Sequence, residues 1–493
     1  MNSPATNPTL QPRPVGRSGP ALSQAWLVAS LVLPTAALAG PTAANTVAPF
    51  DYSTQPGTAP SQLEPASAPA TPPVLDEAAQ HAARAAWWAQ LETDELPGLV
   101  EAALRASPVV ASARGRIERA RAERVAADAA WMPLVMGSAN ASRGKTDLKL
   151  PLSQVSNSGV QASWELDLFG AGRAGSAAQH SRLASAEQAL DAMRLSVAAE
   201  TGQSYVSLRA CEAQRALAEL ELKSHDITVR VSESAADAGF FSSEQPALAR
   251  AAAAQALALL RARDMQCQRL LQSLVTLTAL EEAELRQRLA RRTGQLPSPA
   301  GTVPEQLPAD LLMRRPDLRE AAYAVMAAGY DETAARAQQW PTLSLQGAVG
   351  NSRFSTPQVT FSGQVWSFGP LQITLPIFDA GVRKARVLAA EASQIEARTV
   401  YLAKVRQAAE EVENTLAALH NTRPRELFAR QSSLGYGMAL AAAEQRLQGG
   451  LSSVLEVEQI RRAATQARAN VIELQQTRAN AWISLYRVMG GSW

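Results

Sequence analysis

The chain contains the same strand-and-turn segment twice. Residues 159–172 carry the sequence GVQASWELDLFGAG, and residues 363–381 carry GQVWSFGPLQITLPIFDAG. Phe169 and Phe378 are 209 positions apart (378 − 169), and the same offset separates two other pairs: Gly172 with Gly381, and Trp131 with Trp340. A repeat of this length is much longer than a solenoid unit and indicates that half of a molecule has been duplicated. We therefore expect two copies of one structural plan.

Each copy contains two segments with the alternation of a β-strand. In the second copy Leu371, Ile373 and Leu375 alternate with Gln372 and Thr374. A period of two places the apolar residues on one face of a strand and the polar residues on the other. The same alternation is present at Leu343, Leu345 and Val349 and, in the first copy, at Val160, Ala162, Trp164 and Leu166. We expect strands near 134–141, 159–167, 340–349 and 363–375, with loops at 142–158 and 350–362.

Long stretches without helix breakers follow these strands. No Gly or Pro occurs in 382–423 or in 247–293, and Gly202 is the only breaker between 176 and 238. An unbroken helix over 247–293 would be roughly 70 Å long. Apolar residues recur every seven positions after 381, at Leu388, Ile395, Leu402, Ala409 and Leu416. This spacing predicts helices that pack lengthwise against other helices.

Composition excludes several classes of function. The formal net charge of +2 in 493 residues, without a basic stripe, argues against a nucleic-acid partner. After the N-terminal region no apolar run reaches the roughly 18 residues of a membrane helix, so a membrane role would depend on β-strands. The four histidines show no metal-ligand spacing, and there is no nucleophile or phosphate-loop motif. We expect no catalysis, no metal and no cofactor.

The N-terminus resembles an export signal. Arg13 and Arg17 precede an apolar stretch, and Ala37-Leu38-Ala39 fits a cleavage site between small residues. We expect the following organisation: a signal peptide at 1–39, a Pro- and Ala-rich extended segment at 40–84, a first repeat at 85–293, a linker at 294–308 and a second repeat at 309–493.

Five motifs together resemble the outer membrane factor (TolC-like) family, and within it the proteins that serve resistance-nodulation-division pumps. The motifs are WELDLFGAGR (164–173), LPADLLMRRPDLREA (307–321), WPTLSLQG (340–347), WSFGPLQITLPIFDAGVRKA (366–385) and AEQRLQGGLSSVLEVEQ (443–459). The resemblance implies a mixed membrane protein with long antiparallel α-helical hairpins that form a tunnel and four β-strands per protomer. Three protomers would close a twelve-stranded barrel. The rows Leu343, Leu345, Val349 and Leu371, Ile373, Leu375 would then face lipid.

The resemblance also implies where the functional positions lie. Two hairpin turns, Gly239-Phe240-Phe241 and Gly449-Gly450, would form the periplasmic end of the tunnel, where the channel closes and meets an adaptor protein. Relatives carry Leu and Asp as constriction residues at the positions of Leu455 and Gln459. Gln459 departs from that pattern, so an acidic ring is not expected from this residue. Glu456 and Glu458 are the neighbouring acids.

The only two cysteines lie symmetrically about the first turn. Cys211 precedes Gly239 by 28 residues and Cys267 follows it by 28. In an antiparallel hairpin they would lie side by side, so we expect a disulfide that staples the hairpin; two free buried thiols are the alternative. Many relatives also carry a lipid-anchored Cys after the signal. No Cys is present there, and we expect the barrel alone to hold the protein in the membrane.

The predicted function is a trimeric outer membrane exit duct of a tripartite efflux pump for small molecules such as drugs or metals. Its expected partners are two further copies, a periplasmic adaptor, an inner-membrane pump and the lipid of a Gram-negative outer membrane. Two alternatives remain at this point. One is a duct of the same fold for type I protein secretion. The other is a periplasmic coiled-coil scaffold without a pore, for which the amphipathic strands would be unexplained.

Overall fold

The computed structural model describes residues 87–88, 91, 94–145, 151–299 and 312–491. The predicted signal peptide (1–39) and extended segment (40–84) lie outside the described residues, and the linker predicted at 294–308 is described only as far as residue 299.

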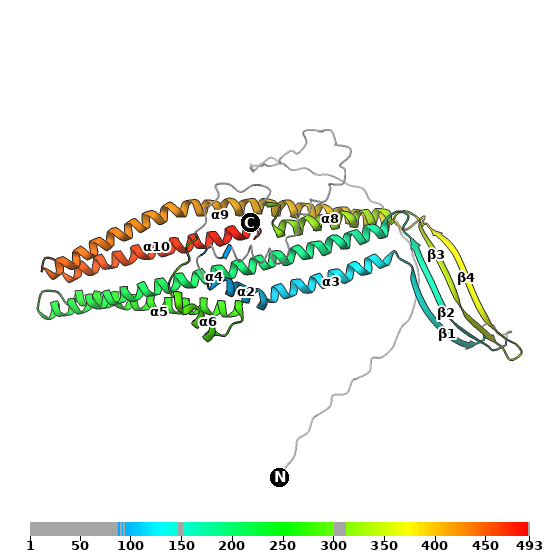
Figure 1. Cartoon of the computed structure of the whole chain (residues 1–493), viewed down its shortest axis with the longest axis horizontal. Coiled ribbons are helices and arrows are strands. Elements are labelled where there is room, and N and C mark those ends of the chain that lie inside the picture. Colours follow the sequence, from blue (N-terminus) through cyan, green and yellow to red (C-terminus); the bar gives the residue numbers. More distant parts are fainter. Residues whose placement is uncertain (1–86, 89–90, 92–93, 146–150, 300–311, 492–493) are drawn as a thin grey trace, which may run out of the picture. The chain divides into compact units, whose positions relative to one another are not determined.

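Both halves of the chain share one order of elements, a helix, two strands and then two long helices (Figure 1). The first half comprises α2 (Leu96–Ala106), α3 (Pro108–Ala130), β1 (Leu134–Gly144), β2 (Ser153–Leu166), α4 (Ala171–Asp237), α5 (Glu244–Thr278), α6 (Glu282–Leu289) and the short 3₁₀ helix η1 (Ala290–Arg292). The second half comprises α8 (Pro316–Ala337), β3 (Thr342–Ser355), β4 (Thr360–Thr374), α9 (Val382–Gln448) and α10 (Val454–Val488). Helices α4 and α9 each have 67 residues, and α5 and α10 each have 35.

The long helices pack as two hairpins placed side by side. Helix α4 packs against α5, α9 packs against α10, and α4 also packs against α10, so the order across the helices is α5–α4–α10–α9. The core at this contact is aromatic: the ring of Trp87 stacks on that of Trp482, with centroids 5.2 Å apart. Gly202 permits the close approach, because a Cβ at this position would lie 3.0 Å from Trp88 and 3.1 Å from Ile483.

The unbroken helix predicted for 247–293 is wrong. Helix α5 ends at Thr278, where Ala279 takes a positive φ of 52°, and α6 begins at Glu282. The turn allows α6 to pack against the core, where Leu285 and Leu289 are buried in one cluster with residues of α2. An exposed straight helix would leave both leucines in water.

Four antiparallel strands form one sheet in the order β1-β2-β3-β4. The strands extend well into the predicted loops: β1 continues to Gly144, β2 begins at Ser153, and only residues 356–359 separate β3 from β4. The extra residues are mostly small or polar, but they still pair through backbone hydrogen bonds, which do not depend on apolar side chains. Strands β1 and β4 are the edges of the sheet and each pairs with a single strand of this chain.

Candidate functional site

The first hairpin turn joins α4 to α5 and presents an aromatic side chain to solvent. Gly239 takes a φ of 79°, a conformation that favours glycine, and the N–H groups of Phe240 and Phe241 both donate to the carbonyl of Ala235. The Phe240 side chain is 82% exposed, whereas Phe241 is half-buried. The turn is therefore fixed by its backbone and holds Phe240 at the tip.

The second turn, between α9 and α10, has the same construction. Gly450 takes a φ of 72°, while Gly449 has an ordinary negative φ, so only one of the two predicted glycines needs its conformational freedom. Leu451 donates its N–H to the carbonyl of Arg446 and is 81% exposed. Ser453 caps α10 by accepting from the Glu456 N–H. Each turn thus presents one large apolar side chain directly after its positive-φ glycine.

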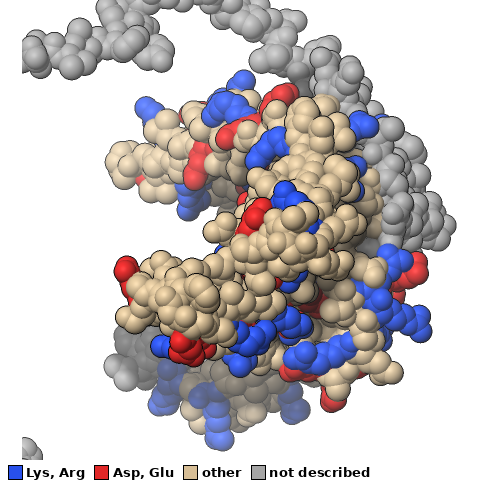
Figure 2. All heavy atoms as spheres, turned by 90° about the vertical axis from the view of Figure 1, so that its left-hand side faces the viewer, with Lys and Arg blue, Asp and Glu red and all other residues tan. Residues whose placement is uncertain are grey.

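Charges of both signs surround the tips. An ion pair bridges the two helices of each hairpin there: Arg250 to Glu233 at 2.8 Å in the first, and Arg446 to Glu456 at 2.9 Å in the second. Figure 2, which views the molecule from the side of the tips, shows acidic and basic side chains interspersed among uncharged ones. The exposed apolar side chains therefore lie within a charged but balanced surface.

The residues predicted to constrict the channel lie in the first turns of α10. Leu455 is half-buried and Gln459 is exposed. The neighbouring acids differ from each other: Glu456 makes the exposed ion pair near the tip, while Glu458 is buried and pairs with Arg461 at 3.1 Å. A constriction would be formed between copies, so the assignment of Leu455 and Gln459 stays a prediction.

A polar contact between the two hairpins was not predicted from the sequence. Arg462 on α10 donates to the hydroxyls of Ser224 and Thr228 on α4, each at 3.3 Å. His225 lies beside this contact, and its pKa is lowered from 6.5 by burial and by the nearby charge of Arg462. No sequence motif marks these residues, because they come together only when α4 packs against α10.

On the sheet, the apolar residues of neighbouring strands share one face. Leu343 lies opposite Ile373 on β4 and Leu345 lies opposite Leu371, while Val349 lies opposite Val160 on β2. Val349, Leu371 and Ile373 are 59%, 62% and 70% exposed, and Leu343 and Leu345 are half-buried. Leu375, which was predicted within the strand, lies one residue past the end of β4 and is 51% exposed.

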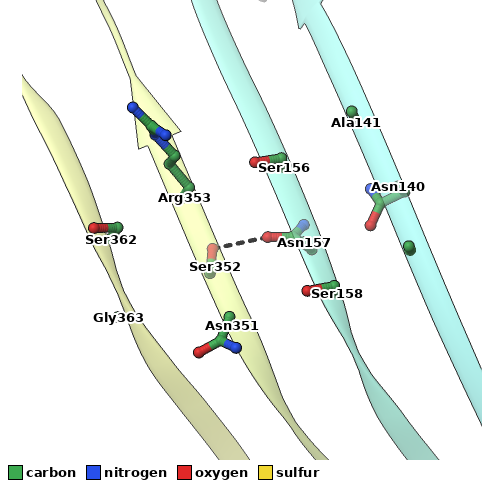
Figure 3. Close-up of a pocket in the computed structure, with 11 residues that line it drawn as sticks. Asn140, Ala141, Ser156, Asn157, Ser158, Asn351, Ser352, Arg353, Ser362 and Gly363 are labelled. Atoms are coloured by element: carbon green, nitrogen blue, oxygen red, sulfur yellow. Dashed lines mark hydrogen bonds between the residues drawn. The ribbon is translucent and has the colours of Figure 1, made fainter.

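The opposite face of the sheet is largely polar. Ser344 lies opposite Gln372, and Ser163 lies opposite Gln346. Farther along the strands, Ser352 donates a hydrogen bond to Asn157 at 2.8 Å (Figure 3), within a shallow hollow with polar walls. One sheet thus has one face suited to an apolar environment and one suited to water.

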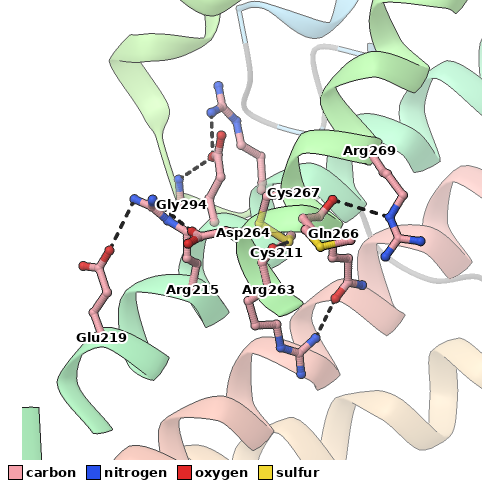
Figure 4. The surroundings of a disulfide bond; sticks show 12 residues. Cys211, Arg215, Glu219, Arg263, Asp264, Gln266, Cys267, Arg269 and Gly294 are labelled. Atoms are coloured by element: carbon pink, nitrogen blue, oxygen red, sulfur yellow. Dashed lines mark hydrogen bonds and ion pairs between the residues drawn. A yellow bond between two sulfur atoms is a disulfide. The ribbon is translucent and has the colours of Figure 1, made fainter. Parts of the chain in front are cut away.

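Cys211 on α4 and Cys267 on α5 form a disulfide bond in the structure, with their Cα atoms 5.5 Å apart (Figure 4). An ion pair between Arg215 and Asp264, 3.5 Å apart, joins the same two helices beside it. The Glu212 carboxylate accepts a hydrogen bond from the Gly294 N–H at 2.8 Å. The segment that follows η1 is therefore bound to α4 next to the disulfide.

The described residues contain no group of three His, Cys, Asp or Glu side chains placed to hold a metal ion. Among the helices of the described ranges, none is both long enough and apolar enough to cross a membrane.

A model of the outer membrane efflux protein family matches the chain in two segments, residues 99–280 and 307–491. The chain belongs to this family. The resemblance seen in the sequence motifs is thereby confirmed, and the two matched segments correspond to the two halves that carry the same elements.

Named relatives of this outer membrane efflux protein act in efflux. SrpC of Pseudomonas putida, a solvent efflux pump outer membrane protein, is 30% identical over 405 residues that cover 80% of this chain and 85% of SrpC. CusC of Escherichia coli O6:H1, a cation efflux system protein, is 28% identical over 438 residues, covering 85% and 91%. The solved structure of the outer-membrane channel OprN superposes with a TM-score of 0.74 at 26% identity, covering 83% of this chain and 92% of OprN.

Proposed function

We propose that three copies of this chain form a channel in the outer membrane of a Gram-negative bacterium, and that this channel is the exit duct of a tripartite efflux pump for small molecules. The observation that carries the proposal is the open four-stranded sheet, which has an exposed apolar face and two edges, β1 and β4. In lipid, unpaired backbone groups at such edges are too costly to persist. Three sheets joined edge to edge close a twelve-stranded barrel without edges.

The two faces of the sheet fit this arrangement. The face that carries Val349, Leu371 and Ile373 would contact lipid, together with Leu343 and Leu345. The face that carries Ser344, Gln346 and Gln372 would line a water-filled passage, as polar interior rows do in membrane barrels.

The surface of α9 supports assembly with further copies. Leu388, Ile395 and Leu402 are spaced by seven residues, as in a coiled coil, but they are 55%, 66% and 45% exposed in the single chain. Their neighbours within the chain leave this stripe uncovered, and it lies in the part of α9 that packs beside α8, at the edge of the row α3–α4–α8–α9. We propose that a helix of the adjacent copy covers this stripe.

The named relatives belong to efflux systems, and we extend that role to this chain with its partners. The tips, at Phe240 and Leu451, would bind a periplasmic adaptor, and an inner-membrane pump of the resistance-nodulation-division type would supply the energy. In this proposal the chain is a passive duct and not an enzyme, with Leu455 and Gln459 at the constriction.

Membrane fractionation followed by measurement of the mass of the detergent-extracted protein tests the assembly. A trimer in the outer-membrane fraction is the expected result. A monomer in the soluble periplasmic fraction would remove the channel and leave the scaffold alternative. Deleting the gene and measuring the accumulation of efflux substrates tests the transport role, and unchanged accumulation of every substrate tried would contradict it.

The tips are tested by replacing Phe240 and Leu451 together by Ser. Losing two apolar anchors should weaken adaptor binding by about tenfold or more and abolish most efflux, while trimer formation is unchanged. The control is Val109→Ser, which changes an exposed side chain (49%) on α3, away from the hairpin turns. Equal efflux by the tip variant and the control would show that the tips do not recognise the partner.

A further inference from the structure

One aromatic contact ties the end of a strand to the start of its neighbour. The ring of Phe169 stacks on that of Trp340, with centroids 5.5 Å apart and planes within 14° of parallel. Phe169 lies between β2 and α4, and Trp340 lies between α8 and β3. Because β2 and β3 are adjacent in the sheet, this contact joins the first half of the chain to the second where strands give way to helices.

The counterparts of these two residues have no such contact within the described part of the chain. Phe378, 209 residues after Phe169, lies between β4 and α9, and Trp131, 209 residues before Trp340, lies between α3 and β1. Strands β1 and β4 are the opposite edges of the sheet. Three strand spacings of about 4.8 Å separate them, roughly 14 Å, so the two rings cannot meet within one protomer.

The segment after β4 leaves Phe378 uncovered by its own protomer. Seven residues lead from Thr374 to the helix cap at Gly381, whereas four lead from Leu166 to the cap at Gly170. Within this longer segment Phe378 is 89% exposed. Stacking on another aromatic ring would bury this surface and add a favourable ring–ring contact.

The helix end of that segment is held in place. Asp379 accepts hydrogen bonds from the Gly381 N–H at 2.9 Å and the Arg383 N–H at 3.1 Å. Asp167 plays the same part in the first half, where it accepts from the N–H groups of Gly172 and Arg173 at 3.1 and 2.9 Å. The segment that carries Phe378 is therefore anchored at α9, as the segment that carries Phe169 is anchored at α4.

We propose that Phe378 of one copy stacks on Trp131 of the adjacent copy, at the seam where β4 meets the neighbouring β1. This inference rests on the proposed trimeric assembly and specifies one of its contacts. The contact repeats, between copies, the arrangement that Phe169 and Trp340 make within one copy. Around a closed trimer, aromatic stacks within and between copies would then alternate at the junction of sheet and helices.

Chemical cross-linking tests the contact with a matched internal control. The variant W131C with F378C should react with a short bis-maleimide to give covalent dimers and trimers. The control, F169C with W340C, should give only a cross-link within one chain, seen as linked peptides by mass spectrometry after digestion and without dimers or trimers. The native cysteines do not interfere, because they are bonded to each other.

The same samples separate failure of this contact from failure of the proposed function. Their native mass in detergent is measured before cross-linking. Trimers of the W131C and F378C variant that yield no intermolecular product, while the internal control reacts, would overturn the contact and leave the trimer intact. Monomers in every sample would overturn the trimer itself, and the contact with it.

A second measurement avoids cysteines. Phe378→Ala should lower the trimer fraction at a fixed subunit concentration by at least about tenfold, because every seam loses its stack at once. Phe378→Tyr should restore it. Ile377→Ala is the control, since Ile377 is 96% exposed on the same segment but carries no ring. An equal loss in both alanine variants would show that the stack is not the cause.

Discussion

Arg209 is a buried charged residue with partners on three segments of the chain. Its side chain is fully buried in α4, and it donates to Glu95 at 2.7 Å, to Glu212 at 3.0 Å and to the carbonyl of Leu289 at 2.8 Å. The Tyr205 hydroxyl donates to the same Glu95 oxygen at 2.9 Å. These bonds connect α4 with the chain preceding α2 and with the end of α6, so one buried cation organises the base of the first hairpin.

Removing the charge of one partner should therefore destabilise the fold. Glu95→Gln keeps the shape of the side chain but leaves the Arg209 charge poorly compensated, and we expect a loss of about 3 kcal/mol in the free energy of unfolding. Thermal unfolding of the purified protein measures this loss. The control is Glu101→Gln, whose partner Arg105 is exposed, and which should change stability by less than about 1 kcal/mol.

His225 gives the contact between the hairpins a dependence on pH. Burial and Arg462 lower its pKa below 6.5, against the opposing charges of Glu221, Asp226 and Glu458. The folded state thus binds the proton less readily than the unfolded state. The contribution of neutral His225 to the free energy of unfolding is therefore complete above pH 6.5 and is lost as the pH falls below that value.

The expected result is a lower unfolding temperature at about pH 5.5 than at about pH 7.5, and a smaller difference in the His225→Gln variant. His420→Gln, at an exposed position on α9, should retain the difference seen in the wild type. If the His225 and His420 variants respond alike, the acid sensitivity arises elsewhere.

At the scale of elements, the disulfide adds a covalent link between α4 and α5, which the ion pairs of Arg215 with Asp264 and of Arg250 with Glu233 also join. It closes 56 residues of chain that include the tip, and many of the residues of α5 are exposed. The cross-link reduces the conformational entropy of the unfolded chain. It therefore stabilises the folded hairpin without changing the course of its helices.

Replacing Cys211 and Cys267 together by Ser should lower the free energy of unfolding by about 2–4 kcal/mol. Thermal unfolding with and without a reducing agent measures the effect. The wild type should unfold at a lower temperature under reducing conditions, and the double variant should be unaffected by the reducing agent. An unchanged wild type would show that the bond adds no stability.

At the scale of the whole molecule, periodic features were predictable and tertiary ones were not. The alternation at Leu371 and Ile373 predicted a strand with one apolar face, because a period of two fixes the side of each residue. The break at Ala279 was not predictable, since alanine is a good helix former and the turn exists only because α6 packs back on the core. The partners of Arg209 come from segments far apart in sequence, and no local sequence pattern predicts them.

The apolar face of the sheet should be the one that meets lipid. Ile373 and Gln372 are adjacent on β4, so their side chains lie on opposite faces, opposite Leu343 and Ser344 of β3. A lysine at position 373, near the end of β4, would place a charge on the lipid-facing side at a cost of up to about 1 kcal/mol per copy, whereas a lysine at 372 would face water in the passage. We expect Ile373→Lys to be depleted from the outer-membrane fraction and Gln372→Lys to insert as the wild type does. Both variants carry the same new charge one residue apart, so a general effect of lysine on β4 would deplete them equally. Normal insertion of Ile373→Lys, equal to that of Gln372→Lys, would mean that the apolar face does not meet lipid at this end of the sheet.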